Sequence, residues 1–141
     1  MDETAESTLT ARCREAFEDR LRLAFWYSTT GGQIDWGVLH FRDDVREAWG
    51  DTDEARTKAA RVINDMSLDR PGDSHYEQIH SAGELLCTTR VFDEAVAMHV
   101  GAGDHGLIVS YDPSADIDQY GFVTDAHELL ERADRDATAG A

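Results

Sequence analysis

The stretch LRLAFWYSTTGGQIDWGVLHF, residues 21–41, decides the fold of this chain. In its first part Leu23, Phe25 and Tyr27 alternate with other side chains, which is the period of a β-strand. Two glycines follow in residues 29–32, and they favour a tight turn because glycine tolerates positive φ angles. The second part alternates in the same way, with Ile34, Trp36 and Val38 on one face and Leu39 and Phe41 on the other. The stretch therefore predicts a β-hairpin.

Helical patterns flank this hairpin on both sides. Apolar residues recur at helical spacing over residues 8–17, which predicts an amphipathic helix after a disordered, acidic N-terminus of residues 1–7. Beyond the hairpin we expect a short helical turn at 45–49. A capping box at 51–54, with Asp first and Glu three residues later, then opens a second helix. The polar loop after it, which contains Pro and Gly, includes a short helical turn that we expect at 76–82.

Three further strands and a last helix complete the chain. Residues 85–92, 95–100 and 107–111 alternate as strands do, and the short connections between them favour antiparallel neighbours. A second capping box, Asp116 with Gln119, predicts the start of the last helix. The remaining residues, 134–141, are expected to form a flexible tail.

The predicted order of elements is α-ββ-α-βββ-α within one domain, residues 8–133. An α+β fold with a single five-stranded antiparallel sheet packed by helices satisfies this order. The order resembles that of the roadblock/profilin-like group, which includes roadblock and longin domains. This resemblance of topology implies a dimeric scaffold or a regulator of small GTPases.

Three short motifs carry a second resemblance. They are Leu-His-Phe-Arg-Asp-Asp-Val at 39–45, His-Ser-Ala-Gly-Glu-Leu at 80–85 followed by Thr89-Arg90 and Phe92, and Gly-Leu-Ile-Val-Ser-Tyr-Asp at 106–112. Together they resemble a family of short haloarchaeal proteins to which no activity is assigned. The likeness covers roughly residues 20–130. It implies a haloarchaeal source and a salt-rich environment, but no reaction.

The charge of the chain indicates the same environment. The sequence has 29 Asp and Glu against 13 Lys and Arg, for a formal net charge of −16, and Lys58 is its only lysine. Such a charge opposes a compact state in dilute buffer, whereas concentrated salt screens the repulsion. We therefore expect a halophilic protein, with an acidic mesophilic protein as the alternative. The excess of acidic residues also argues against nucleic-acid binding, which depends on basic patches.

The remaining composition predicts a cytoplasmic protein without a cofactor. Cys13 and Cys87 lie far apart among apolar residues, which indicates buried, reduced thiols. We find no apolar run of the roughly 20 residues that a membrane span needs, and no signal-peptide pattern near Met1.

The aromatic residues of the hairpin are the candidate partner-binding surface. Phe25 and Trp26 point to opposite faces of one strand, so at least one aromatic face needs cover from a helix or from another subunit. With Trp36 on the second strand, they form either core or an interface. We predict Phe25, Trp26 and Trp36 as partner-binding residues.

Arg90, His99 and His105 are the candidate ligand-binding residues. An arginine in a strand can hold a carboxylate or phosphate, or pair with an acid on a neighbouring strand. His99 and His105 are expected to flank one turn, where they would ligate zinc with Glu84 or Asp104, or lie as ordinary histidines at the strand edge.

The chain offers no nucleophile motif, so we assign no catalytic residue. The adjacent carboxylates of Asp43 and Asp44, beside Arg42, form either an acid–base or cation site or an ion-paired turn. The sequence favours an interaction or regulatory module that acts as a homodimer or with a protein partner. The alternatives are a small-molecule sensor and a metal-dependent enzyme that uses the histidines and the paired Asp.

Overall fold

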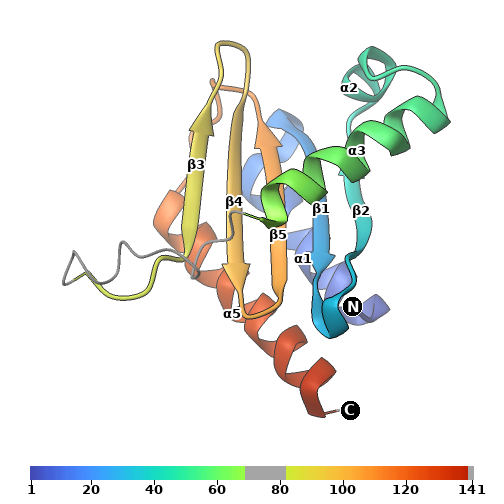
Figure 1. Ribbon diagram of the computed structural model, residues 1–141. Helices are drawn as coiled ribbons and strands as arrows, with labels where there is room; N and C mark the ends of the chain where they lie inside the picture. The colour runs from blue at the N-terminus through green and yellow to red at the C-terminus, as the bar shows by residue number, and fades with distance from the viewer. Residues whose placement is uncertain (69–81, 140–141) are drawn as a thin grey trace.

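Five antiparallel strands form one sheet in the order β2-β1-β5-β4-β3 (Figure 1). The computed structural model describes residues 1–68 and 82–139. The strands are β1 (Leu21–Ser28), β2 (Asp35–Phe41), β3 (Cys87–Val91), β4 (Val96–Ala102) and β5 (His105–Tyr111). The helices are α1 (Glu3–Phe17), α2 (Asp43–Ala48), α3 (Thr52–Ser67) and α5 (Gln119–Ala139), with short 3₁₀ turns at η1 (Glu18–Arg20) and η2 (Thr30–Gly32). This confirms the predicted α+β class and its five-stranded antiparallel sheet.

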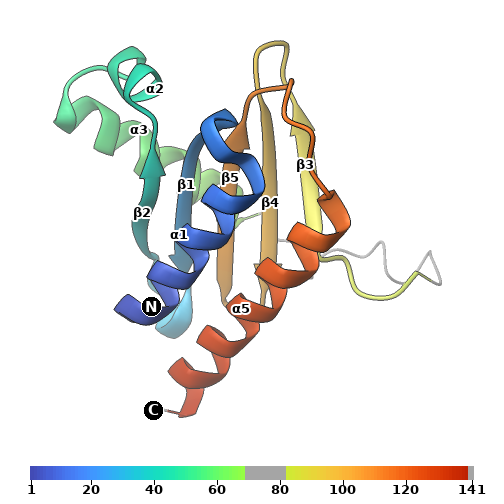
Figure 2. The ribbon, with the colours of Figure 1, turned by 180° about the vertical axis from the view of Figure 1, so that it is seen from behind.

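Helices cover both faces of the sheet. The first and last helices, α1 and α5, lie on one face, whereas α3 crosses the other (Figures 1 and 2). The alternation along β1 separates two cores accordingly. Ala24 and Trp26 pack in the core beneath α1 and α5, and Phe25 and Tyr27 pack in the core beneath α3. The inner strand β1 is therefore apolar on both faces, and its residues are buried almost throughout.

The helix ends differ from the sequence predictions at three places. The first helix begins at Glu3, because Asp2 accepts a hydrogen bond from the amide of Ala5 and so caps it. The last helix is capped by Asp118, which binds the amide of Gly121, and it continues to Ala139 where a flexible tail was expected. The predicted cap of α3 is confirmed, since Asp51 binds the amide of Glu54 at 2.9 Å.

The connection between β4 and β5 is shorter than the sequence predicts. Gly101 and Ala102 continue β4, so the turn consists of Gly103 and Asp104 alone. Gly101 pairs with Gly106 across the two strands. The helical turn predicted at 76–82 lies outside the described residues, apart from Ala82. Within the described residues no helix is long and apolar enough to cross a membrane.

Candidate functional site

The aromatic residues of the hairpin lie mainly in the cores. Phe25 is fully buried beneath α3, where its ring contacts those of Trp36, Phe41 and Trp49 at centroid distances of 5.9 to 6.2 Å. Trp26 is buried on the opposite face, and Trp36 is half-buried at the edge of the sheet. The cover that the sequence required comes from the chain's own helices. Of the three predicted partner-binding residues, only Trp36 presents appreciable surface.

His99 belongs to a buried polar pair beneath α3. Its Nε2 lies 2.7 Å from the hydroxyl oxygen of Tyr27, and both side chains are completely buried. Arg90 lies on the same face of the sheet, because it is two residues from Thr88, which pairs with His99 across β3 and β4. The structure thus brings two of the three predicted ligand-binding residues to one face.

His105 lies on the opposite face and has a different partner. Its Nδ1 is 3.1 Å from the carboxylate of Asp134 on α5, which also accepts the amide hydrogen of Asp104 at 3.0 Å. His105 also lines a cavity of about 240 Å³ beside the N-terminus. Since His99 and His105 point to opposite faces of the sheet, they cannot share a metal ion. Among the described residues there is no cluster of three potential metal ligands.

Arg42 joins the ends of several elements through all five of its N–H groups. Its guanidinium binds the carboxylate of Asp112 through Nη1 at 2.8 Å and Nη2 at 3.1 Å. It binds Asp44 in the same two-point manner, through Nε at 2.6 Å and Nη2 at 3.1 Å. The fifth N–H donates to the carbonyl oxygen of Asp19 at 3.0 Å. Asp43 instead pairs with Arg46, so the adjacent carboxylates form an ion-paired turn and do not face one another.

The hydrogen bonds from Arg42 hold the pKa values of Asp112 and Asp44 below their ordinary range. A carboxyl group with a lowered pKa stabilises the folded state above its unfolded pKa of about 4. That contribution is lost as the pH falls through the lower, folded value. Acid should therefore open this end of the sheet.

Replacing Asp112 with asparagine should lower the free energy of unfolding by about 1.5–3 kcal/mol at neutral pH, because a charged, doubly bound acceptor is lost. The variant should also lose less stability than the parent between about pH 5 and pH 2. Thermal unfolding at fixed salt and protein concentration measures both effects. Asp43→Asn is the matched control, since it removes an exposed pair that contributes about 0.5 kcal/mol. Equal effects of the two substitutions would contradict the role of Arg42.

The outer edge of β3 is a surface that the sequence patterns did not indicate. Among the described residues β3 pairs only with β4, in five consecutive pairs without a bulge. Thr89 and Val91 are exposed on this strand, and Phe92 directly after it is 57% exposed. The stretch 85–92 contains no Asp or Glu, in a chain with 29 of them. That gap in the acidic pattern was the available signal.

The N-terminus of α5 extends this surface around the corner of the sheet. Gln119 donates a hydrogen bond to the hydroxyl of Thr89 at 3.2 Å, and Tyr120 beside it is 79% exposed. Tyr120 is a large apolar residue of the last helix, yet it does not belong to the core. It is exposed because it lies in the first turn of α5, at the rim of the sheet, where Gln119 reaches β3. Val91, Phe92 and Tyr120 together with the edge of β3 form what we call the β3 surface.

Comparisons with known proteins agree with this fold. The family described as "Domain of unknown function (DUF7522)" matches residues 7–131. No curated protein matches the chain in sequence. A roadblock/LC7 domain from Streptomyces avermitilis is similar in structure, with a TM-score of 0.55 and 19% identity over 97% of this chain and 98% of that one.

A second solved structure, MglB from Myxococcus xanthus, has a TM-score of 0.53 and 13% identity. The match covers 96% of this chain and 94% of that protein. At these identities the similarity concerns the fold. It confirms the predicted resemblance to roadblock domains, and the family match adds a family to which no function is assigned.

Proposed function

This chain belongs to the DUF7522 family, and from its roadblock/LC7 fold and its surface we propose that it is a non-catalytic protein-interaction module that acts as a homodimer. The single observation that supports this function most is the edge of β3, which carries no acidic residue and pairs with no second strand among residues 1–68 and 82–139. An exposed strand edge is a template for pairing with another strand, and proteins normally protect it with charges, proline or a bulge.

The two edges of the sheet differ in this protection. The edge strand β2 begins with Asp35 and has an irregular register against β1, between Ala24 and Phe25. The edge strand β3 has a regular register, and its only charged residue is Arg90. Two copies of β3 pairing antiparallel about Thr89 would satisfy both edges and bury Val91 and Phe92. This supports β3 as the homodimer contact.

Replacing Thr89 with glutamate should convert the dimer to a monomer. In a pairing centred on Thr89, the two new carboxylates would face each other, and like charges directly opposite are destabilising. The side chain of Thr89 is exposed, so the fold of each chain should persist. Light scattering after size exclusion in multi-molar KCl should change from twice the mass of one chain to its 15.7 kDa.

Val38→Glu is the control for this experiment. Val38 is 50% exposed on β2, so the substitution places the same charge on the other edge of the sheet. It should leave the dimer intact. A parent protein that is monomeric in native salt would overturn the proposal. Dissociation by Val38→Glu alone would instead place the contact at the β2 edge, beside Trp36.

A further inference from the structure

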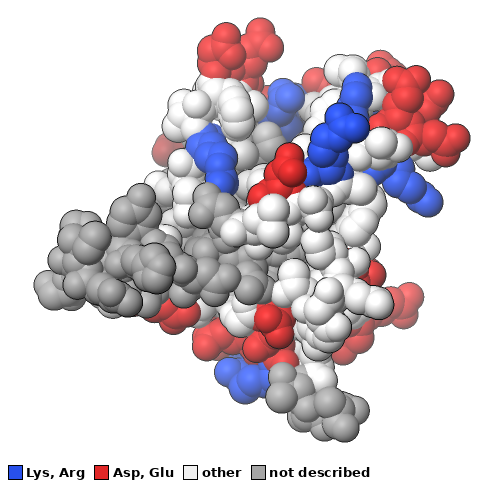
Figure 3. Space-filling model, in the orientation of Figure 1, with Lys and Arg blue, Asp and Glu red and all other residues white. Residues whose placement is uncertain are grey.

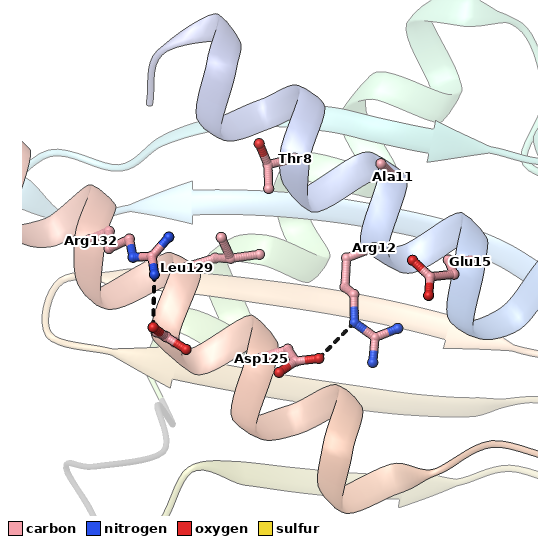
Figure 4. Close-up of a pocket in the computed structure, with 8 residues that line it drawn as sticks. Thr8, Ala11, Arg12, Glu15, Asp125, Leu129 and Arg132 are labelled. Carbon is pink, nitrogen blue, oxygen red and sulfur yellow. Dashed lines mark hydrogen bonds and ion pairs between the residues drawn. The ribbon is translucent and has the colours of Figure 1, made fainter.

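A groove runs along the seam between α1 and α5, on the face of the molecule that Figure 2 shows. It comprises cavities of about 330, 190 and 240 Å³. The first two share Thr8, Leu129 and Arg132, and the last two share Ala5 and Asp136, so the three are continuous. We call this the α1/α5 groove; Figure 4 shows residues that line the largest of its three cavities.

The two helices that form the groove run antiparallel. Arg12 of α1 contacts Asp125 of α5 at 2.9 Å, whereas Asp2 lines the same cavity as Asp136. Positions facing the groove recur at intervals of four, three and four residues on both walls. They are Thr4, Thr8, Ala11 and Glu15 on α1, and Asp125, Leu129, Arg132 and Asp136 on α5.

This spacing fits a third helix. Positions repeated at alternating intervals of three and four form a straight seam on a helix, and a ridge of side chains from another helix fills the space between two such seams. Eleven residues of α-helix extend about 17 Å, so the groove accommodates roughly three turns. Ala11 and Thr8 are small, which leaves room for a guest backbone to approach, and Leu129 provides an apolar contact in the middle (Figure 4).

The charges of the groove specify which helix it accepts. Both arginines are already bound to carboxylates of the groove, Arg12 to Asp125 at 2.9 Å and Arg132 to Glu128 at 2.8 Å. Glu15 at one end and Asp136 at the other are exposed and make no ion pair within the described residues. A guest with a cationic residue near each end and a small apolar centre would complement both.

We propose that the α1/α5 groove binds a cationic amphipathic helix of a protein partner. This site lies apart from the β3 surface, because α1 packs on β1 and β2 and the groove is lined by α5 from Asp125 onward, whereas Gln119 in the first turn of α5 contacts β3. The protein would then bind a partner helix in the α1/α5 groove while it pairs with a second copy through the β3 surface. Binding here and dimerisation are therefore separable by measurement.

The test uses a fluorescein-labelled helical peptide of about 16 residues, with leucine and alanine on one face and arginine at both ends. Fluorescence anisotropy with the full chain, in KCl at which it is folded, should show saturable binding. Thr8→Trp fills the centre of the groove from an exposed position and should weaken binding at least tenfold. Circular dichroism would establish that the variant is folded, and light scattering that its oligomeric state is unchanged.

A charge swap makes the test specific. The double variant Glu15→Arg with Asp136→Arg should lose affinity for the arginine peptide at least tenfold and gain affinity for a matched peptide with glutamate at both ends. The control double variant, Asp53→Arg with Asp65→Arg on α3, changes the net charge equally and should leave both affinities as in the parent. Absence of binding, unchanged binding to Thr8→Trp, or equal losses in the two double variants would overturn the proposal.

Discussion

Replacing Gly106 with alanine should destabilise the protein by about 3 kcal/mol, the upper end of the usual cost of overpacking a core. A Cβ atom on Gly106 would overlap the ring carbons of Tyr27, which lies flat against this glycine across β1 and β5. Tyr27 cannot easily move away. It is completely buried, and its hydroxyl is held 2.7 Å from His99 Nε2.

Urea unfolding at fixed salt, followed by the fluorescence of the three tryptophans, measures this loss. Gly31→Ala is the matched control. Gly31 has a φ of 76° with nothing within 4 Å of an added Cβ, so its substitution should cost only the left-handed backbone, about 1–2 kcal/mol. Combining Gly106→Ala with Tyr27→Ala should cost less than the sum of the two single losses, since the overlap disappears. Equal losses for the two glycines would contradict the tight packing.

Transfer from multi-molar KCl to a dilute buffer should unfold the protein, which is the second large effect that we expect. The screening length rises from about 3 Å at 1 M salt to about 30 Å at 0.01 M. In dilute buffer the acidic side chains that give the net charge of −16 therefore repel one another across the whole molecule. On the face shown in Figure 3, the Asp and Glu side chains form several separate groups, at the top, in the upper middle, at the upper right and along the lower edge. With 29 Asp and Glu against 13 Lys and Arg, local ion pairs cannot neutralise this charge.

Circular dichroism during stepwise dilution of KCl measures this transition, and return to high salt should restore the signal. A variant with lysine at Glu47, Asp65, Asp93 and Glu94 halves the net charge at exposed positions. Its transition should shift to a lower KCl concentration. Retention of structure in dilute buffer would overturn the proposal that the protein is halophilic.

Alternation and capping made most of the fold predictable from the sequence. The period of two in residues 21–41 depends only on strand geometry, and the cap at Asp51 only on local hydrogen bonding. The start of α1 was not predicted because residues 3–7 contain no large apolar side chain, so no helical spacing of apolar residues can be recognised there. The predicted strands 95–100 and 107–111 are each two residues short at the turn, because Gly101 and Gly106 favour a turn in the sequence pattern. In the structure both glycines lie within strands, and Gly106 leaves room for the ring of Tyr27.

The candidate site was less predictable, because it depends on which faces are covered and on the exact strand ends. The aromatic pattern of β1 requires two covered faces, but it does not say whether a helix or a partner covers them. In the structure β4 continues to Ala102, which pairs with His105 on β5. Ala102 lies three residues after His99, and residues an odd number apart point to opposite faces of a sheet. His99 and His105 therefore lie on opposite faces. Errors of two residues at the end of β4 and at the start of β5 were enough to place these histidines together at one turn.

The position of β1 between β2 and β5 also constrains how the chain can be made. During synthesis the hairpin of β1 and β2 leaves the ribosome first, yet the other edge of β1 stays open until His105–Tyr111 has been translated. Pairings between residues some 80 positions apart, such as Tyr27 with Gly106, are slow to form because a long loop must close first. Between the synthesis of β2 and that of β5 the nascent chain therefore carries an aromatic strand with one open edge. This is the interval in which the chain is most exposed to aggregation and to chaperones.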